Sequence, residues 1–216
     1  MKQIKHIIPG KYDIGVIDSG KGGEFISRHI SKVFPDANFY QYKPYIFRPF
    51  GTMGTQELRN QMDIHLDYLN GLNLDFIVIG CMTASVRMGT YLRDKIKIPY
   101  WDIYLPLVYN LPEDCTVVCT PNSVPGFNKH NVIPCTELAS MVERNYPERK
   151  LTDSDLLFKI KEYFQGIPFN PSGKPLLLGC THYYAVDDML SEVSQCSEII
   201  YPHTFLNNAL IKHYDR

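Results

Sequence analysis

Two cysteines occupy matching turns in the two halves of this 216-residue chain. Cys180, with His182 two positions later, follows a short apolar run that ends in glycine. Cys81 follows an apolar run of the first half in the same way. Buried parallel strands resemble such runs, and sites of α/β proteins form just beyond the carboxyl ends of strands. We therefore predict that the two thiols face each other across one cleft.

The residues around these thiols favour proton transfer. A free thiol has a pKa of about 8.5, so it acts as a base only where its surroundings lower that pKa. A helix N-terminus does so, and Cys81 and Cys180 both stand where a helix is expected to begin. His182 can exchange a proton with Cys180, and Asp18, which ends the first expected strand, can assist Cys81. The rule that sites form at strand ends also brings Thr120 to this cleft. Such a set suits proton removal next to a carboxylate, with one cysteine as thiolate base and the other as thiol acid.

The elements that must hold these side chains alternate along the chain. The expected strands cover residues 12–17, 38–42, 75–79, 100–104, 116–120, 131–134, 176–178 and 198–201. The expected helices cover residues 24–34, 55–70, 84–95, 135–145, 152–165 and 186–193, with a last helix from 204. This alternation predicts an α/β protein with one or two mainly parallel sheets and right-handed crossovers. Pro99 marks a change in composition, where we place the crossover into a second unit.

Composition excludes several classes of function. The chain has 44% hydrophobic and 21% charged residues and a formal net charge of −1, which gives no electrostatic footprint for nucleic acid or an anionic membrane. No apolar run approaches the roughly 18 residues of a membrane span, and the start of the chain does not have the pattern of a signal peptide. Of the six cysteines, several lie in or directly after apolar runs, which predicts reduced thiols and a cytoplasmic protein. We assign structural roles to Cys115, Cys119, Cys135 and Cys196.

Two other sites are considered and set aside. The glycine-rich turn of residues 18–23 could be mistaken for a dinucleotide-binding fingerprint, but Phe25 stands where the third glycine is needed. A zinc site from Cys81, Cys180 and His182 stays open as an alternative, although no paired Cys-x-x-Cys spacing supports it. The residues alone give no positive reason to expect a metal or a nucleotide.

Six motifs carry a resemblance to a known family. They are Gly15–Gly23, Pro49–Gly51, Cys81–Ala84, Thr120–Val124, Cys135 with Val142 and Glu143, and Gly179–Tyr183. Through them the chain resembles the cofactor-independent aspartate/glutamate racemase superfamily, and most closely glutamate racemase. The resemblance runs from about Ile14 to the C-terminal region, and Gly179–Tyr183 is its most specific motif.

The resemblance implies a fold and a division into domains. The fold would be α/β, with two similar three-layer domains, each built on a mainly parallel sheet, and an active site in the interdomain cleft. We expect residues 1–98 to form the first domain, completed by the C-terminal helix of about residues 203–216. Residues 99–202 would form the second domain.

The resemblance also implies roles for individual residues. Cys81 and Cys180 would stand on opposite faces of the α-carbon of an amino-acid substrate; Asp18 would assist Cys81, and His182 and Glu143 would assist Cys180. The implied substrate-binding residues are Ser19, Pro49, Phe50, Gly51, Met82, Thr83, Thr120, Ser123 and Thr181. No pyridoxal phosphate or other cofactor is expected, and a homodimer is left open.

Departures from the family pattern keep other functions open. Met82 stands where the family has an asparagine that contacts the amino-acid head group, and Phe50 stands where it has a tyrosine. The predicted function is racemisation of glutamate, aspartate or a related amino acid. The alternatives are an isomerase or decarboxylase of the superfamily that acts on an acid without an amino group, or a catalytically weakened racemase-like binding protein.

Overall fold

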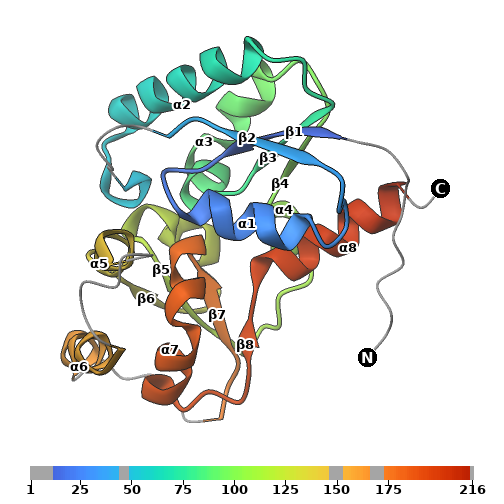
Figure 1. The fold of residues 1–216 in the computed structure, drawn as a ribbon. Coiled ribbons are helices and arrows are strands. Elements are labelled where there is room, and N and C mark those ends of the chain that lie inside the picture. The colour runs from blue at the N-terminus through green and yellow to red at the C-terminus, as the bar shows by residue number, and fades with distance from the viewer. Residues whose placement is uncertain (1–11, 44–48, 146–152, 166–172, 215–216) are drawn as a thin grey trace.

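The computed structural model describes residues 12–43, 49–145, 153–165 and 173–214. In these residues the chain forms two four-stranded sheets, one in each half, with helices packed on their faces (Figure 1). Every strand pair in both sheets is parallel. The predicted α/β fold with two parallel sheets is confirmed.

The first sheet has its most apolar strands in the middle. Its strands are β1 (Asp13–Ile17), β2 (Asn38–Gln41), β3 (Phe76–Ile79) and β4 (Tyr100–Asp102). Their order is β2-β1-β3-β4, and every residue of β3 is buried. A continuous apolar run is what a strand covered on both faces requires.

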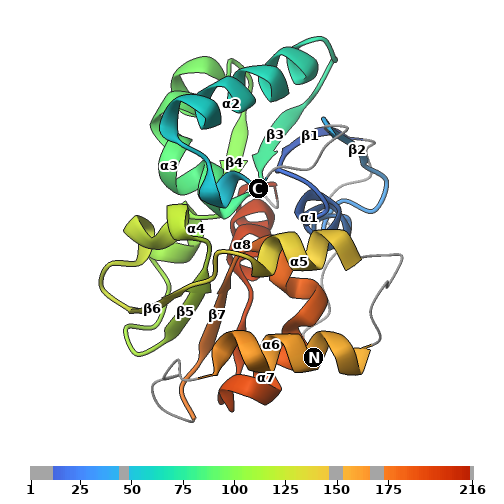
Figure 2. The same cartoon turned by 90° about the vertical axis from the view of Figure 1, so that its left-hand side faces the viewer.

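Helices cover both faces of this sheet. They are α1 (Gly22–Ile30), α2 (Thr55–Asn70) and α3 (Met82–Lys95), with a short 3₁₀ helix η1 (Phe50–Thr52) before α2. Helices α2 and α3 lie on one face and α1 on the other (Figure 2). Alternate β3 residues serve the two layers, because Ile77 and Ile79 belong to the core under α2 and α3, while Phe76 and Val78 pack with α1.

The second half repeats this plan. Its strands are β5 (Thr116–Cys119), β6 (Asn131–Pro134), β7 (Leu176–Gly179) and β8 (Ile199–Ile200), in the order β6-β5-β7-β8. Its helices are η2 (Pro121–Phe127), α5 (Leu138–Asn145), α6 (Asp153–Phe164), η3 (Thr181–Val186) and α7 (Asp187–Ser194). The central strands β1 and β3 of one sheet therefore correspond to β5 and β7 of the other.

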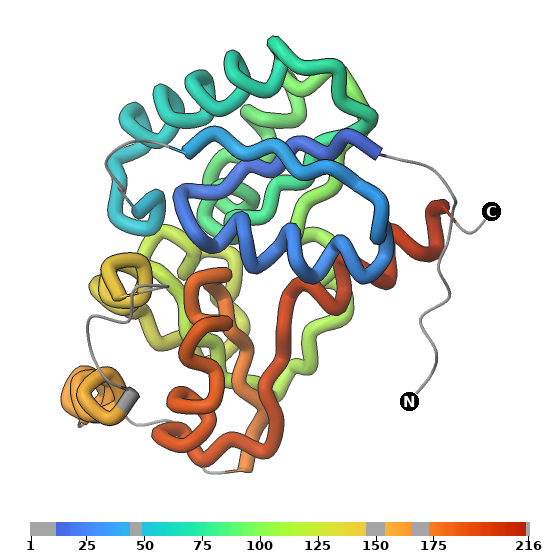
Figure 3. Tube along the Cα trace, viewed as in Figure 1, coloured from blue at the N-terminus to red at the C-terminus, as the bar shows by residue number. Residues whose placement is uncertain are grey.

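The last helix, α8 (Pro202–Tyr214), returns the chain to the first half. It runs alongside α1 (Figure 3), where the Asn207 amide donates a hydrogen bond to the His29 carbonyl at 3.1 Å. Near its end, the Tyr214 ring packs edge-on against Phe34, with ring centroids 5.3 Å apart. The expected grouping of this helix with the first domain agrees with these contacts, and the division into domains stays a prediction.

The region after Pro99 differs from what we expect. A strand was expected over residues 100–104 at the start of the second unit, but β4 ends at Asp102 and pairs with β3 of the first sheet. The strand stops because the Asp102 carboxylate accepts the backbone N–H groups of Tyr104 and Leu105, at 2.8 and 2.7 Å. The short helix α4 (Leu105–Val108) follows. The first sheet thus extends beyond the expected crossover at 98/99.

Differences at the other elements are small. The turn after Cys180 forms the 3₁₀ helix η3, which includes Val186. The α-helix expected from residue 186 therefore begins at Asp187, as α7. The helix expected over 55–70 has those bounds in the structure. In the described parts of the chain, no helix has the length and apolar character that crossing a membrane requires.

Candidate active site

The carboxyl ends of both sheets meet at one small cavity between the two halves. Eleven of the predicted site residues line it: Ser19, Pro49, Phe50, Gly51, Cys81, Met82, Thr83, Thr120, Cys180, Thr181 and His182. Ala139 and Gly179 complete the lining. Asp18, Glu143 and Ser123, also predicted, do not line the cavity and lie behind residues that do. The space inside is enough for about one water molecule.

Cys180 lies at the start of a chain of hydrogen bonds. Its sulfur is 3.8 Å from Nδ1 of His182, and Nε2 of His182 is 2.8 Å from a carboxylate oxygen of Glu143. Burial by itself would lower the pKa of His182, but its hydrogen bonds to Cys180 and Glu143 raise that pKa to about 10. Burial likewise works to raise the pKa of Glu143, but the hydrogen bonds from His182 and the Lys21 N–H, together with the charges of both residues, outweigh burial and hold that pKa below its usual value. At neutral pH, His182 is therefore a cation paired with the Glu143 anion.

Lys21 joins this chain from the other half of the molecule and was missed from the sequence. Its backbone N–H donates to the Glu143 carboxylate at 3.0 Å, and its ammonium group donates to the Glu143 carbonyl at 2.9 Å. Lys21 precedes α1, whereas Glu143 lies on α5, so the pair ties the two halves together. The only sequence signal was a lysine inside a glycine-rich turn, which indicates nothing about a partner 122 positions away.

Cys81 has a different environment from Cys180. It follows β3 and precedes α3, as expected, and its side chain is buried. Burial raises the pKa of the Cys81 thiol, and the nearby Asp18 charge raises it further, against a smaller lowering by the Ala84 and Thr83 N–H groups. The expectation that the helix start lowers this pKa is wrong for the closed cavity, because desolvation of the thiolate outweighs the helix terminus. Cys81 is therefore a protonated thiol here.

Asp18 is completely buried behind the cavity. Its two carboxylate oxygens accept the Gly20 N–H and the Thr181 hydroxyl, each at 3.1 Å. Burial raises the pKa of Asp18, and the His182 charge and these hydrogen bonds offset part of that rise. The Asp18–Thr181 bond is a second polar link between the two halves.

Three hydroxyl groups form a closed triangle beside the cavity. Thr83 lies 2.9 Å from Thr120 and 3.0 Å from Ser123, and Thr120 lies 3.1 Å from Ser123, measured between hydroxyl oxygens. All three side chains are buried. Each hydroxyl has one O–H donor and two acceptor lone pairs, so the three bonds of the triangle use all three donors and leave one acceptor on each oxygen. A donor becomes available to a ligand only when a bond of the triangle opens.

Gly51 lies at one of the points where the two halves approach each other closely. A Cβ at this position would come within 2.6 Å of Thr120 Cγ2, which is closer than real contacts allow. Asn122, which sequence analysis did not identify, holds this approach by donating its amide to the carbonyls of Phe50 and Met53, at 2.9 and 2.8 Å. Glycine is therefore required at position 51 for the cavity to close.

A Gly51→Ala variant is expected to lose the closed contact. Forcing a methyl group against Thr120 costs about 1–3 kcal/mol of unfolding free energy. It also opens the path to Cys81, so alkylation of Cys81 by iodoacetamide becomes faster. Gly54→Ala is the matched control, because a Cβ at Gly54 meets nothing within 4 Å. Thermal unfolding measures the loss of stability, and peptide mapping of the alkylated protein measures the rate at which Cys81 reacts. Equal stability and equal alkylation rates in the two variants would contradict this account of closure.

No metal-binding group is apparent in the described residues. Nowhere in those ranges do three His, Cys, Asp or Glu side chains converge in a way that could hold a metal ion. The zinc alternative built on Cys81, Cys180 and His182 therefore has no support from the geometry.

Comparisons with known proteins agree with the motifs. The chain is 27% identical over 207 residues to a glutamate racemase of Persephonella marina, covering 88% of this chain and 75% of the relative. It is 28% identical over 204 residues to a glutamate racemase of Clostridium acetobutylicum, covering 87% and 78% of the two chains. No family model matches the chain.

A solved structure shows the same fold. A glutamate racemase from Bacillus anthracis superimposes with a TM-score of 0.79 and 19% identity, over 94% of this chain and 81% of that one. The resemblance to the aspartate/glutamate racemase superfamily, closest to glutamate racemase, is confirmed.

Proposed function

We propose that this chain is an amino-acid racemase that uses Cys81 and Cys180 as its two acid–base groups. Its similarity to glutamate racemases supports racemase activity on an amino acid. The observation that carries the two-cysteine proposal is that both thiols line one cavity, each from the end of a different sheet. Thiols in such positions can reach one α-carbon from two sides.

The protonation states of the closed cavity favour one starting arrangement. Cys81 is a thiol in the closed cavity, and the Cys180 sulfur lies 3.8 Å from Nδ1 of the cationic His182, so we assign Cys81 as the acid and Cys180 as the base of one direction. In one direction the Cys180 thiolate removes the α-proton and becomes a thiol, and Cys81 then gives its proton to the opposite face of the carbanion. In the other direction the two groups exchange roles. No net proton is gained or lost.

The polar groups of the cavity would hold the amino acid. The hydroxyls of Thr83, Thr120 and Ser123 would turn from one another to donate to the α-carboxylate, with Thr181 next to Cys180. Ser19 and the Phe50–Gly51 backbone would meet the far end of the substrate. Asp18 would act on Cys81 through its charge, since no hydrogen bond between their side chains is present among the described residues.

Substrate entry requires the two halves to separate. The closed cavity has room for about one water molecule, much less than an amino acid needs. The contacts between the halves include the polar links Lys21–Glu143 and Asp18–Thr181, the Asn122 amide bonds and the Thr83 hydroxyl bonds, together with apolar packing. A bound acid would form polar contacts in place of some of those that opening removes. When the halves close around the substrate, the reactive groups return to a site that holds little water.

One residue favours a second candidate function. Met82 is 2% exposed, lines the cavity and packs in the apolar core, and it offers no hydrogen-bond donor or strong acceptor to an amino group. An acid without an amino group, taken by an isomerase or decarboxylase, would not need that contact. Incubation of the protein with amino acids and with acids that lack an amino group separates the two candidates. Conversion of a hydroxy acid, or release of carbon dioxide, without any conversion of an amino acid would favour the second candidate.

Chiral chromatography of glutamate and aspartate enantiomers after incubation with the protein tests the proposal. We expect either enantiomer of one amino acid to yield the same final mixture. If the folded protein changes neither amino acids nor other small acids, the proposal fails, and a catalytically weakened racemase-like binding protein remains.

A Met82→Asn variant is expected to improve use of an amino-acid substrate. One restored polar contact is worth about 1 kcal/mol, which lowers KM by about fivefold. Burying an amide in apolar surroundings costs about 1–3 kcal/mol of unfolding free energy. Met82→Leu is the control and leaves KM near that of the unmodified protein. Steady-state kinetics and urea unfolding measure both quantities, and an unchanged KM in folded Met82→Asn would exclude position 82 from head-group recognition.

The remaining expectations stay predictions. All six cysteines are free thiols, which supports a reducing, cytoplasmic environment. A homodimer stays an open expectation.

A further inference from the structure

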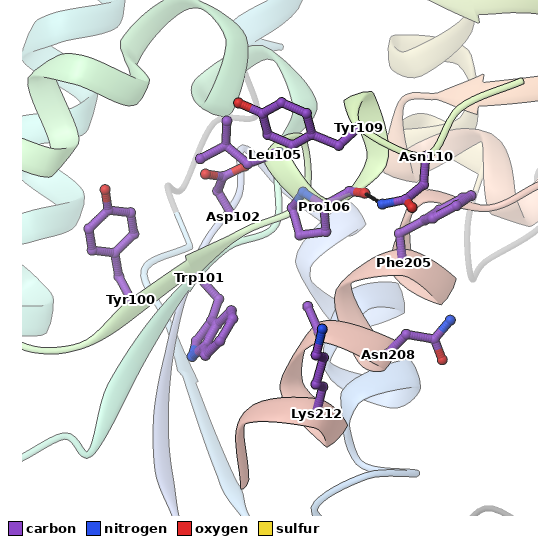
Figure 4. A pocket seen from close by; sticks show the side chains of 11 residues that line it. Tyr100, Trp101, Asp102, Leu105, Pro106, Tyr109, Asn110, Phe205, Asn208 and Lys212 are labelled. Carbon is purple, nitrogen blue, oxygen red and sulfur yellow. Dashed lines mark hydrogen bonds between the residues drawn. The ribbon is translucent and has the colours of Figure 1, made fainter. Parts of the chain in front are cut away.

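A second, larger cavity lies where the chain passes from the first sheet toward the second. Its volume is about 680 Å³, within the usual range for small-molecule sites. Side chains reach it from β4, α4 and α8, and they include Trp101, Pro106, Tyr109, Phe205 and Lys212 (Figure 4). It shares no lining residue with the candidate active site.

The cavity is rich in aromatic faces. Trp101 and Phe205 are half-buried, and Tyr109 at the rim is 83% exposed. An aromatic ring left this open to water forgoes the stabilisation that burial would bring. Aromatic rings stack favourably on planar partners, so these side chains together suit a flat, unsaturated ligand.

The polar groups of the cavity favour an anion. Lys212 is exposed, and no ion pair to it is found within the described part of the chain. The Asp102 carboxylate, the acid group of this lining, is buried and already accepts the N–H groups of Tyr104 and Leu105. The Asn208 amide also has no hydrogen-bond partner among the described residues and lies on α8 one turn before Lys212. Besides the hydroxyls of Tyr100 and Tyr109, the polar groups that face a ligand are an ammonium and an amide, and their donors suit a carboxylate, sulfonate or phosphate.

We propose that this cavity is a binding site for a planar aromatic anion. The ring stacks against the aromatic lining that includes Trp101 and Phe205, and the acid group pairs with Lys212. The site stands apart from the racemase proposal, because neither its lining nor its test involves Cys81 or Cys180.

The chain offers a specific reporter for this site. Trp101 is the only tryptophan of the sequence, so its indole N–H gives a single identifiable cross-peak in a ¹⁵N-correlated NMR spectrum. We expect 2-naphthoate to shift this peak in a saturable manner. The neutral 2-naphthylmethanol is expected to bind more weakly, and the cationic 2-naphthylmethylamine more weakly still.

Variants separate the charge from the stacking. Lys212→Met is expected to weaken binding of 2-naphthoate by about fivefold, the usual upper effect of one exposed ion pair, and to leave 2-naphthylmethanol unchanged. Phe205→Ala weakens both ligands by similar factors. Lys129→Met is the matched control, since this exposed lysine does not line the cavity. The proposal is overturned if the Trp101 peak does not move, if the amine binds as well as the acid, or if Lys212→Met leaves 2-naphthoate affinity unchanged.

Discussion

A Cys81→Ser or a Cys180→Ser variant is expected to racemise its amino acid about 10²–10⁴-fold more slowly than the unmodified protein. Serine keeps the size of the side chain, but its hydroxyl is a far weaker acid than a thiol and does not provide a base at neutral pH. Because each cysteine would serve one face of the α-carbon, neither can replace the other. Initial rates in both directions, measured by chiral chromatography, give the size of the loss.

The two variants are also expected to differ in a complementary way. A protein that keeps only one cysteine can remove the α-proton of one enantiomer and return a solvent proton to the same face. Each variant should therefore exchange the α-hydrogen of one enantiomer without inverting it, and the two variants should prefer opposite enantiomers. Cys196→Ser is the control, because Cys196 does not line the cavity and its sulfur lies 3.7 Å from the Ser191 hydroxyl. Full activity in either catalytic-site variant would remove that cysteine from the mechanism.

Replacing Glu143 with glutamine is expected to change both stability and its dependence on pH. The pKa of His182 is raised from about 6.5 to about 10, so its contribution to the unfolding free energy is complete below about pH 6.5 and is lost as pH rises through 10. The pKa of Glu143 is lowered, so its contribution is present above its usual value near 4.5 and is lost as pH falls further. The pair therefore stabilises the fold most between about pH 5 and 7.

Glu143→Gln keeps the size of the side chain and an acceptor for the Lys21 N–H, but it removes the charge that His182 faces. At pH 7 we expect the unfolding free energy to fall by about 3 kcal/mol, as for other buried pairs that lose one partner. The decline in stability between pH 7 and 10 should become shallower, since His182 then titrates nearer its usual pKa. Glu137→Gln, an exposed carboxylate directly before α5, is the matched control. Urea unfolding at several pH values measures the effect, and parallel pH profiles in both variants would contradict the assigned ion pair.

The positions of the strand-end residues were predictable from local sequence. Apolar runs such as that of β3 must be buried strands, and a parallel sheet places the residues after them at one edge. That reasoning brought Cys81, Thr120 and Cys180 to one cleft, and the cavity contains all three. Both strand-end thiols follow from the same pattern. The sequence of this chain alone was therefore enough to predict that they lie together.

Contacts between the two halves were not predictable in this way. Lys21 and Glu143 are 122 positions apart, and no local pattern relates them. The Asn122 bonds to the Phe50 and Met53 carbonyls depend on how closely the halves approach, which the sequence of each half does not state. The pKa of Cys81 was misjudged because it depends on how deeply the folded chain buries this side chain, which a helix-start pattern does not state.

The strand after Pro99 shows a further limit of local patterns. The residues of β4 are as suited to the edge of one sheet as to the start of another, and only pairing with β3 decides between the two. Asp102 ends this strand through its own side chain, as acidic residues often do at helix starts. A composition change at a proline therefore located the crossover only to within a few residues.

The central claim is that two sulfur atoms act on opposite sides of one carbon. Racemisation of a protiated amino acid in heavy water, followed by mass spectrometry of each separated enantiomer at early times, tests it most directly. The account predicts that the newly formed enantiomer carries one deuterium at Cα while the unreacted starting enantiomer keeps its hydrogen. Product that retains the original hydrogen, or equal deuterium in both enantiomers from the first turnovers, would contradict it.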